Sequence, residues 1–249
     1  DFDGVIVDGI SEYWTSSRNA FLEIIEEENH TYDLPLEVPQ TFRELRPWVK
    51  YGWEMVLIAA EIARSNSYLS TIGSKVFTKH YQENCNGALK EWGWNSEQLQ
   101  ISLNNVRTKS IKANKRKWLE SHLVFPGIQD LINQLHQENI DFGVLTTKST
   151  IFTAELLNHL NLRPQLLYGY EAGNKTTILL KISKERLIKG FIEDRRATLE
   201  TVLKTPEINC IPCYLASWGY LKPNDLDNLP ANIRLLKPKH LMSSLANWP

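Results

Sequence analysis

The first eight residues of the chain, Asp1-Phe2-Asp3-Gly4-Val5-Ile6-Val7-Asp8, carry the side chains best suited to chemistry. Two carboxylates two residues apart, followed by a glycine, can point into one site at the end of a strand. One carboxylate can then act as a nucleophile while the other exchanges protons, and both can help to hold a hard cation. The string also suits an Asx-type turn, in which Asp and Gly are common. We favour a functional site over a turn.

The elements that must position this string change in character at residue 122. Apolar positions at three- and four-residue spacing predict helices over 12–28, 41–64, 70–92 and 96–122, the last with Asn95 as its N-cap. Strands then alternate with helices: strands over 141–146, 166–168, 188–193, 209–216 and 233–236, and helices over 126–138, 150–160, 175–182, 196–203 and 238–246. Such alternation predicts an α/β fold with a doubly wound parallel sheet. We expect a Rossmann-like core from residues 1–11 and 123–249, with a helical domain inserted at 12–122.

The residues Asp1–Asp8 resemble the first motif of the haloacid dehalogenase superfamily, Asp-x-Asp-Gly-(Val/Thr)-hydrophobic-x-Asp. Three further motifs of that family follow in order. A hydrophobic strand ending in Thr or Ser matches Phe142–Lys148, a Lys at the start of a later helix matches Lys175, and a strand ending in acidic residues matches Gly190–Arg195. The helical block lies where the superfamily inserts its C1 cap domain, and Trp218-Gly219-Tyr220 is similar to the phosphoglycolate-phosphatase-like branch. The resemblance therefore covers the whole chain.

Two positions depart from the family pattern. Gly9 stands where the family usually has Ser after the last Asp of the first motif. The fourth motif reads Glu193-Asp194-x-x-x-Thr198, whereas the family often has Gly-Asp-x-x-x-Asp. Glu193 and Asp194 are therefore both candidate metal ligands, and the alignment of the motif favours Asp194 as the direct one.

The resemblance implies a Mg²⁺-dependent phosphatase that hydrolyses a small phosphorylated metabolite through an aspartyl-phosphate. Asp1 would attack phosphorus, and Asp3 would protonate the leaving oxygen and then accept a proton from water. Mg²⁺ would lie between the Asp1 carboxylate, the Asp3 backbone carbonyl and Asp194. Thr146 would donate a hydrogen bond to a phosphate oxygen, and Lys175 would supply a fixed positive charge beside it.

Asp3 narrows the reaction that the resemblance implies. Members of the superfamily that dehalogenate carry an aromatic residue at this position, and phosphonatases carry Ala. A sugar-phosphate mutase keeps the Asp, so it stays open as an alternative. A catalytically silent protein that keeps the fold for binding or regulation is the other alternative.

The candidates for substrate binding are Thr147, beside Thr146, and Arg46 in the helical block. In the superfamily the cap closes over the substrate, excludes water and selects the leaving group. Arg46, or Lys50 on the same segment, could contact a second anionic group of the substrate. Surface or salt-bridge roles are the plainer interpretation of both side chains.

Composition excludes several classes of function. The chain has 249 residues, with 28 Lys and Arg against 29 Asp and Glu, so no global basic field supports nucleic-acid binding. The basic run from Lys109 to Lys117 is interpreted as a solvated helix face. No apolar run reaches the ~18 residues of a membrane span, and we expect a cytoplasmic protein. Cys210 and Cys213 lie within an expected strand and lack a second ligand pair, so they are interpreted as buried structural cysteines.

The sequence opens on Asp1 rather than on Met. A catalytic carboxylate needs firm support on both sides. We therefore expect an apolar strand of about five or more residues before Asp1, and a targeting segment upstream of that strand stays possible in principle.

Overall fold

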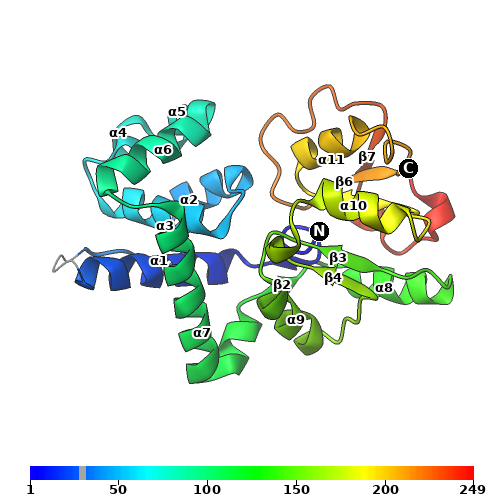
Figure 1. The fold of residues 1–249 in the computed structure, drawn as a ribbon, viewed down its shortest axis with the longest axis horizontal. Helices are drawn as coiled ribbons and strands as arrows, with labels where there is room; N and C mark the ends of the chain where they lie inside the picture. The colour runs from blue at the N-terminus through cyan, green and yellow to red at the C-terminus, as the bar shows by residue number, and fades with distance from the viewer. Residues whose placement is uncertain (28–31) are drawn as a thin grey trace. The chain divides into compact units, whose positions relative to one another are not determined.

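A computed structural model describes residues 1–27 and 32–249 (Figure 1). The expected end of the first helix, Glu28, lies outside the described residues. The chain divides into two compact units, which we call the core unit, Asp1–Asp8 with Leu123–Pro249, and the inserted unit, Gly9–His122. No helix among the described residues combines the length and apolar character that a bilayer span requires.

The core unit alternates strands and helices, and its pairing is mainly parallel. Its elements are β1 (Val7–Asp8), β2 (Leu123–Val124), α8 (Ile128–Gln137), β3 (Gly143–Leu145), α9 (Thr150–His159), β4 (Leu166–Tyr168), η3 (Tyr170–Ala172), α10 (Lys175–Ser183), β5 (Phe191–Glu193), α11 (Arg196–Leu203), β6 (Cys213–Ala216), β7 (Ile233–Leu236), η4 (Pro238–His240) and η5 (Leu245–Asn247). β3 pairs in parallel with β4, and β5, β6 and β7 form a second parallel sheet in that order. The predicted α/β fold with a Rossmann-like parallel core is confirmed.

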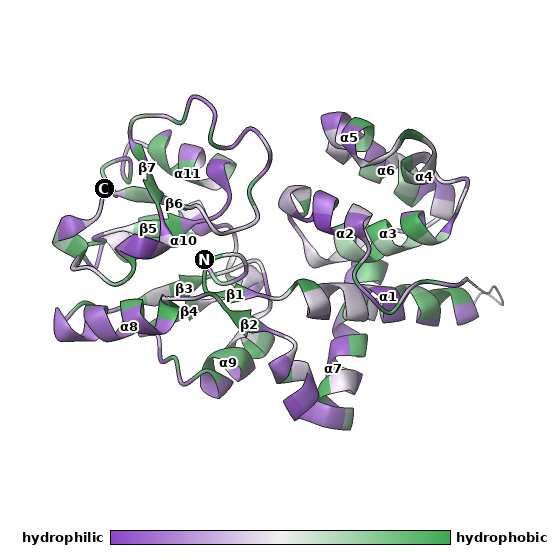
Figure 2. Cartoon of the chain, turned by 180° about the vertical axis from the view of Figure 1, so that it is seen from behind, coloured by the Kyte–Doolittle hydropathy of each residue, from purple (hydrophilic) through white to green (hydrophobic). Residues whose placement is uncertain are grey.

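Apolar side chains hold the second sheet and its helices together. All four residues of β6 are buried, as expected for a parallel strand covered on both faces. Leu179 of α10, Leu199 and Val202 of α11 and Leu215 of β6 belong to one buried cluster. Figure 2 shows hydrophobic colour along the strands and mixed colour along helices such as α8. This buried cluster therefore fixes the positions of the strands in the second sheet.

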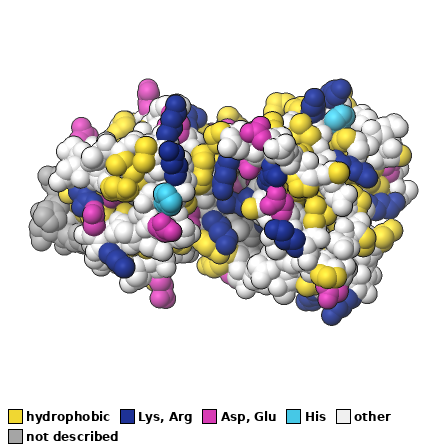
Figure 3. Space-filling view, turned by 90° about the horizontal axis from the view of Figure 1, so that it is seen from above, with side chains coloured by type: hydrophobic (Ala, Val, Ile, Leu, Met, Phe, Trp, Pro, Cys, Tyr) yellow, Lys and Arg dark blue, Asp and Glu magenta, His cyan; other side chains and the backbone are white. Residues whose placement is uncertain are grey.

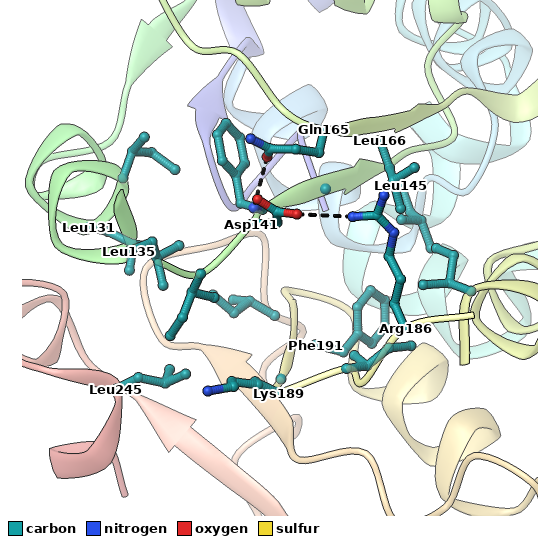
Figure 4. Close-up of a pocket in the computed structure, with 18 of the residues that line it drawn as sticks. Leu131, Leu135, Asp141, Leu145, Gln165, Leu166, Arg186, Lys189, Phe191 and Leu245 are labelled. Carbon is teal, nitrogen blue, oxygen red and sulfur yellow. Dashed lines mark hydrogen bonds and ion pairs between the residues drawn. The ribbon is translucent and has the colours of Figure 1, made fainter. Parts of the chain in front are cut away.

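β3 and β5 each leave one edge unpaired within the described residues. Both strands line a groove of about 430 Å³, together with apolar residues of α8 and α10. An ion pair of 3.0 Å between Asp141 and Arg186 lies along this groove (Figure 4). The backbone nitrogen of Asp1, which also lines it, donates to the carbonyl of Ile192 in β5 at 2.8 Å. Asp1 thus lies against the unpaired edge of β5.

The core unit differs from the sequence prediction at the ends of several elements and at one cysteine. The expected helix over 238–246 consists of two 3-10 turns, η4 and η5. β6 begins at Cys213, so the expected strand over 209–216 is too long at its start. Cys210 is exposed and precedes the strand, whereas Cys213 is buried, so the prediction of two buried cysteines is wrong for Cys210. Apolar residues thus begin before Cys213, which is the first residue of β6 that pairs with a neighbouring strand.

The inserted unit is helical. Its elements are α1 (Ile10–Glu27), α2 (Gln40–Leu45), η1 (Arg46–Trp48), α3 (Gly52–Ala63), α4 (Tyr68–Ile72), α5 (Ser74–Phe77), η2 (Thr78–His80), α6 (Tyr81–Trp92) and α7 (Ser96–Glu120). Asn95 caps α7 as predicted, because its Oδ1 accepts from the amide of Gln98 at 2.9 Å.

Three long helices predicted in this unit are interrupted, and the one over 96–122 has a kink at Asn114, where φ is −158° and ψ is 85°. The expected helix over 41–64 is wrong, because Pro47 lacks an N–H and the chain passes through η1 and an extended turn before α3. The expected helix over 70–92 is also wrong. Gly73 adopts φ +74° there and separates α4 from α5.

A buried ion pair joins α1 to α7 within the inserted unit. Arg107 donates to both carboxylate oxygens of Glu12 at 2.8 Å, and the Trp118 indole donates to the same carboxylate at 3.3 Å. Glu12 and Arg107 are 2% and 4% exposed. Such a bidentate pair fixes both geometry and charge.

Basic and acidic side chains are interspersed on the face that Figure 3 shows. Two members of the basic run on α7 have acidic partners, since Lys109 pairs with Glu23 at 2.8 Å and Arg116 pairs with Glu120 at 2.7 Å.

Candidate active site

Asp1 and Asp3 lie on a tight loop that closes around the carbonyl of Phe2. That carbonyl accepts from the amides of Ile6 at 2.8 Å and Val7 at 3.1 Å. The ring of Phe2 is fully buried, and Gly4 adopts φ +86°. A loop with this many internal bonds holds its two carboxylates in defined places.

Lys175 connects the first and fourth motifs. It is the first residue of α10, and its Nζ lies 2.8 Å from Oδ1 of Asp1 and 2.6 Å from Oε2 of Glu193. The Asn174 side chain caps the helix by accepting from the amide of Thr177 at 2.9 Å. The start of α10 is thereby fixed, and the ammonium group neutralises part of the charge on the two carboxylates.

Asp1, Glu193 and Asp194 form an acidic cluster at the end of β5. One carboxylate oxygen from each residue lies within 4.8 Å of the others. Glu193 and Asp194 are 1% and 6% exposed. Clustered carboxylate oxygens are the donor set that a hard divalent cation such as Mg²⁺ prefers, so the residues present fit that metal. The Asp3 carboxylate is outside this cluster of described residues.

Thr146 directly follows β3 and is 3% exposed. Its amide donates to the carbonyl of Tyr168 at 2.9 Å, and its Oγ1 accepts from the amide of Lys148 at 3.1 Å. Since a hydroxyl has one donor and two acceptor positions, the Thr146 O–H can still donate. Thr147, the next residue, is exposed.

Lys148 is a site residue that the sequence prediction missed. Its side chain is only 2% exposed, and Nζ lies 3.6 Å from Oδ1 of Asp3. The signal was its position two residues after Thr146, which places it on the same loop at the end of β3. A buried lysine beside the proposed acid adds a second positive charge to the site.

Arg46 and Lys50 belong to the inserted unit, so their predicted contact with the substrate stays a prediction. The guanidinium of Arg46 lies over the ring of Tyr13, 5.0 Å from its centroid. Lys50 is exposed, and its Nζ lies 5.0 Å from the centroid of the Tyr51 ring. Tyr13 also explains Gly9, because a Cβ atom at that position would collide with the Tyr13 ring. A serine would not fit there without a shift.

A model of haloacid dehalogenase-like hydrolases matches residues 52–171. Over this span the chain is similar to the haloacid dehalogenase-like hydrolases. The matched span contains the Thr146 segment, and the other three motifs of this superfamily lie on either side of it. The resemblance stated from the motifs is therefore confirmed, as is the prediction of a hydrolase at the level of the family.

Several solved structures have the same fold as this chain. A predicted phosphatase from Clostridium acetobutylicum is 18% identical, with 97% of this chain and 94% of that chain covered at a TM-score of 0.57. A candidate phosphoglycolate phosphatase from Lactobacillus delbrueckii subsp. bulgaricus is 16% identical, with 96% and 93% covered at a TM-score of 0.54. A candidate beta-phosphoglucomutase from Thermotoga maritima is 17% identical, with 97% and 94% covered at a TM-score of 0.53. No functionally curated protein matches this chain.

Proposed function

We propose that the chain is a Mg²⁺-dependent phosphatase that hydrolyses a small phosphorylated metabolite through an aspartyl-phosphate on Asp1. The observation that carries this proposal is the meeting of Asp1, Glu193 and Asp194 within 4.8 Å of one another, with Lys175 in contact with two of them. Phosphoryl transfer relies on positioning and charge neutralisation, and this cluster supplies both.

The charges around the loop support a divalent cation. Asp1, Asp3, Glu193 and Asp194 carry four carboxylates against the two ammonium groups of Lys148 and Lys175. The carboxylates outnumber the ammonium groups of these lysines, and a divalent cation would offset this excess of negative charge. Asp1, Asp194 and Glu193 would hold the cation with their carboxylates, and Asp3 with its backbone carbonyl. When bound, the cation offsets the repulsion between an anionic nucleophile and an anionic phosphate.

The protein side chains divide the reaction into two displacements. The Asp1 carboxylate attacks phosphorus, so an Asp1 oxygen–phosphorus bond forms while the ester oxygen–phosphorus bond breaks and the leaving oxygen takes a proton from Asp3. Water then attacks the same phosphorus and passes its proton to Asp3, and the bond to Asp1 breaks. Thr146 donates to a phosphate oxygen through its free O–H position, and Lys175 stabilises the charge on the transferred group.

The test is hydrolysis of p-nitrophenyl phosphate with Mg²⁺ by the wild type, Asp1→Asn and Asp130→Asn. Asp130 is an exposed carboxylate in the first turn of α8 and serves as the matched control. We expect phosphate release by the wild type and the control and a loss of at least about 10³-fold in Asp1→Asn, because the nucleophile is removed. Equal rates in the three proteins would refute the assignment of Asp1.

Two alternatives give other results. A sugar-phosphate mutase, which the Thermotoga maritima neighbour keeps open, would convert a sugar phosphate into an isomer with little free phosphate. A catalytically silent protein would turn over no member of a panel of phosphorylated metabolites. The same panel would identify the substrate of an active phosphatase.

A further inference from the structure

The segment Trp218-Gly219-Tyr220, which follows β6, contacts three separate parts of the candidate site. We propose that Tyr220 and Gly219 are positioning residues that hold Asp194 as a metal ligand and tie it to the loop that carries Asp1 and Asp3. This inference rests on the proposed function and extends it to residues outside the four motifs.

The first contact orients Asp194. The backbone amide of Tyr220 donates to Oδ2 of Asp194 at 2.9 Å. Two glycines enclose the same carboxylate, since a Cβ atom on Gly4 or on Gly219 would collide with Asp194. Gly4 also adopts φ +86°, which disfavours any side chain. The hydrogen bond from Tyr220 and the close backbone of the two glycines therefore help to fix the position of Asp194.

The second contact reaches the far end of the first motif. The hydroxyl of Tyr220 donates to Oδ1 of Asp8 at 2.6 Å. Asp8 is the last residue of β1 and is the partner of Leu123 in β2. Tyr220 thus binds Asp194 through its backbone amide and the last residue of the first motif through its side chain.

The third contact lies in the middle of that loop. The indole Nε1 of Trp218 donates to the carbonyl of Val5 at 3.1 Å. Together the three bonds connect residues 5 and 8 of the first motif with residue 194, which directly follows β5. A metal site needs its ligands held to a fraction of an ångström, and partners of the ligands commonly set metal affinity.

The test compares Mg²⁺ binding by isothermal titration calorimetry in the full chain without any substrate. Gly219→Ala pushes a methyl group into Asp194, and Tyr220→Phe removes the bond to Asp8 but keeps the backbone amide. Tyr214→Phe removes a hydroxyl from buried β6 and is the matched control. We expect the Kd for Mg²⁺ to rise by about 10-fold or more in Gly219→Ala and by a smaller factor in Tyr220→Phe, with no change in the control.

Thermal unfolding separates this role from simple packing. Variants that lower Tm without Mg²⁺ but leave the Kd within twofold of the wild type would overturn the positioning role. If the wild type binds no Mg²⁺, the proposed function fails, and hydrogen exchange of residues 2–8 then decides the inference. Equal protection of these amides in Tyr220→Phe and Tyr214→Phe would overturn it.

Discussion

Nζ of Lys148 lies 3.6 Å from Oδ1 of Asp3, and both side chains are largely enclosed by protein. This ion pair places a positive charge beside the group to which we assign proton transfer. We expect Lys148→Met to lower kcat for p-nitrophenyl phosphate by about 10²-fold, because a preorganised charge at the reacting centre is lost. Lys148→Arg should recover only part of the rate, since the guanidinium is larger.

Steady-state kinetics at saturating Mg²⁺ provide the measurement. The control is Lys204→Met, which removes an exposed charge at the end of α11, and equal kcat values in it and in Lys148→Met would contradict the role.

The acidic cluster predicts unequal roles for its two neighbouring residues. Glu193 accepts from Lys175 at 2.6 Å, so the Lys175 ammonium group competes with a cation for the Glu193 carboxylate. We expect Asp194→Asn to weaken Mg²⁺ binding more than Glu193→Gln does. In the wild type, Mg²⁺ at 100 times its Kd should add about 2.7 kcal/mol of stability, and EDTA should remove it. Calorimetry and thermal unfolding measure both effects, and a larger loss in Glu193→Gln would reverse the assignment.

The buried pair of Glu12 and Arg107 predicts a large stability effect in the inserted unit. Arg107→Met leaves the Glu12 carboxylate buried without its bidentate partner, which should cost about 3–5 kcal/mol. Urea-induced unfolding measures the loss. Arg116→Met breaks an exposed pair on the same helix and should leave the unfolding midpoint unchanged. If both variants unfold at the wild-type midpoint, the buried pair does not contribute as expected.

The three cysteines should differ sharply in reactivity. Burial raises the pKa of Cys85 to about 12, with a further contribution from Glu54, and burial raises the pKa of Cys213 to about 11. A raised thiol pKa leaves less thiolate at pH 8, and the thiolate is the species that reacts. We expect Ellman's reagent to modify only Cys210 rapidly in the folded protein and all three thiols in urea. Cys210→Ser should abolish the rapid phase, so a rapid phase that persists in this variant would show that a buried thiol is accessible.

The groove between β3 and β5 allows a test of strand addition at these two edges. Two parallel strands with facing unpaired edges can accept one more strand, and the Asp1–Ile192 bond already continues the pairing of β5. We expect six apolar β-branched residues fused before Asp1 to raise Tm, since both faces of such a strand would be buried. A Gly-Ser segment of the same length is the control. The same Tm in both fusions would argue against strand addition.

The sequence predicts the core elements more accurately than the helical insertion. β4, α11 and β7 begin and end at the expected residues, because short apolar runs between polar loops leave little freedom in register. Pro47 and Gly73 break helices whose apolar spacing continues across the break, so periodicity alone joins the pieces. Turn-forming residues inside a periodic run carry the missing information.

The sequence likewise predicts some residues of the candidate site and misses others. Motif order led to Asp1, Lys175, Glu193 and Asp194, and the structure brings these four together. Lys148 was missed because its position two residues after Thr146 does not by itself show whether its side chain is buried or exposed. Its burial and its contact with Asp3 arise from the loop after β3, which only the folded chain defines.

The pairing of β1 with β2 has a consequence for the architecture of the chain. Asp8 and Leu123 are Cα partners in that antiparallel pair, so the chain leaves the core unit and returns to it at neighbouring positions. For the core, the whole inserted unit then acts as a single long loop, whose closure entropy grows only slowly with its length. The insertion is therefore a replaceable module: a graft of another helical unit, or of a short turn, between residues 8 and 123 would leave the parallel sheets and the acidic cluster with their connections intact.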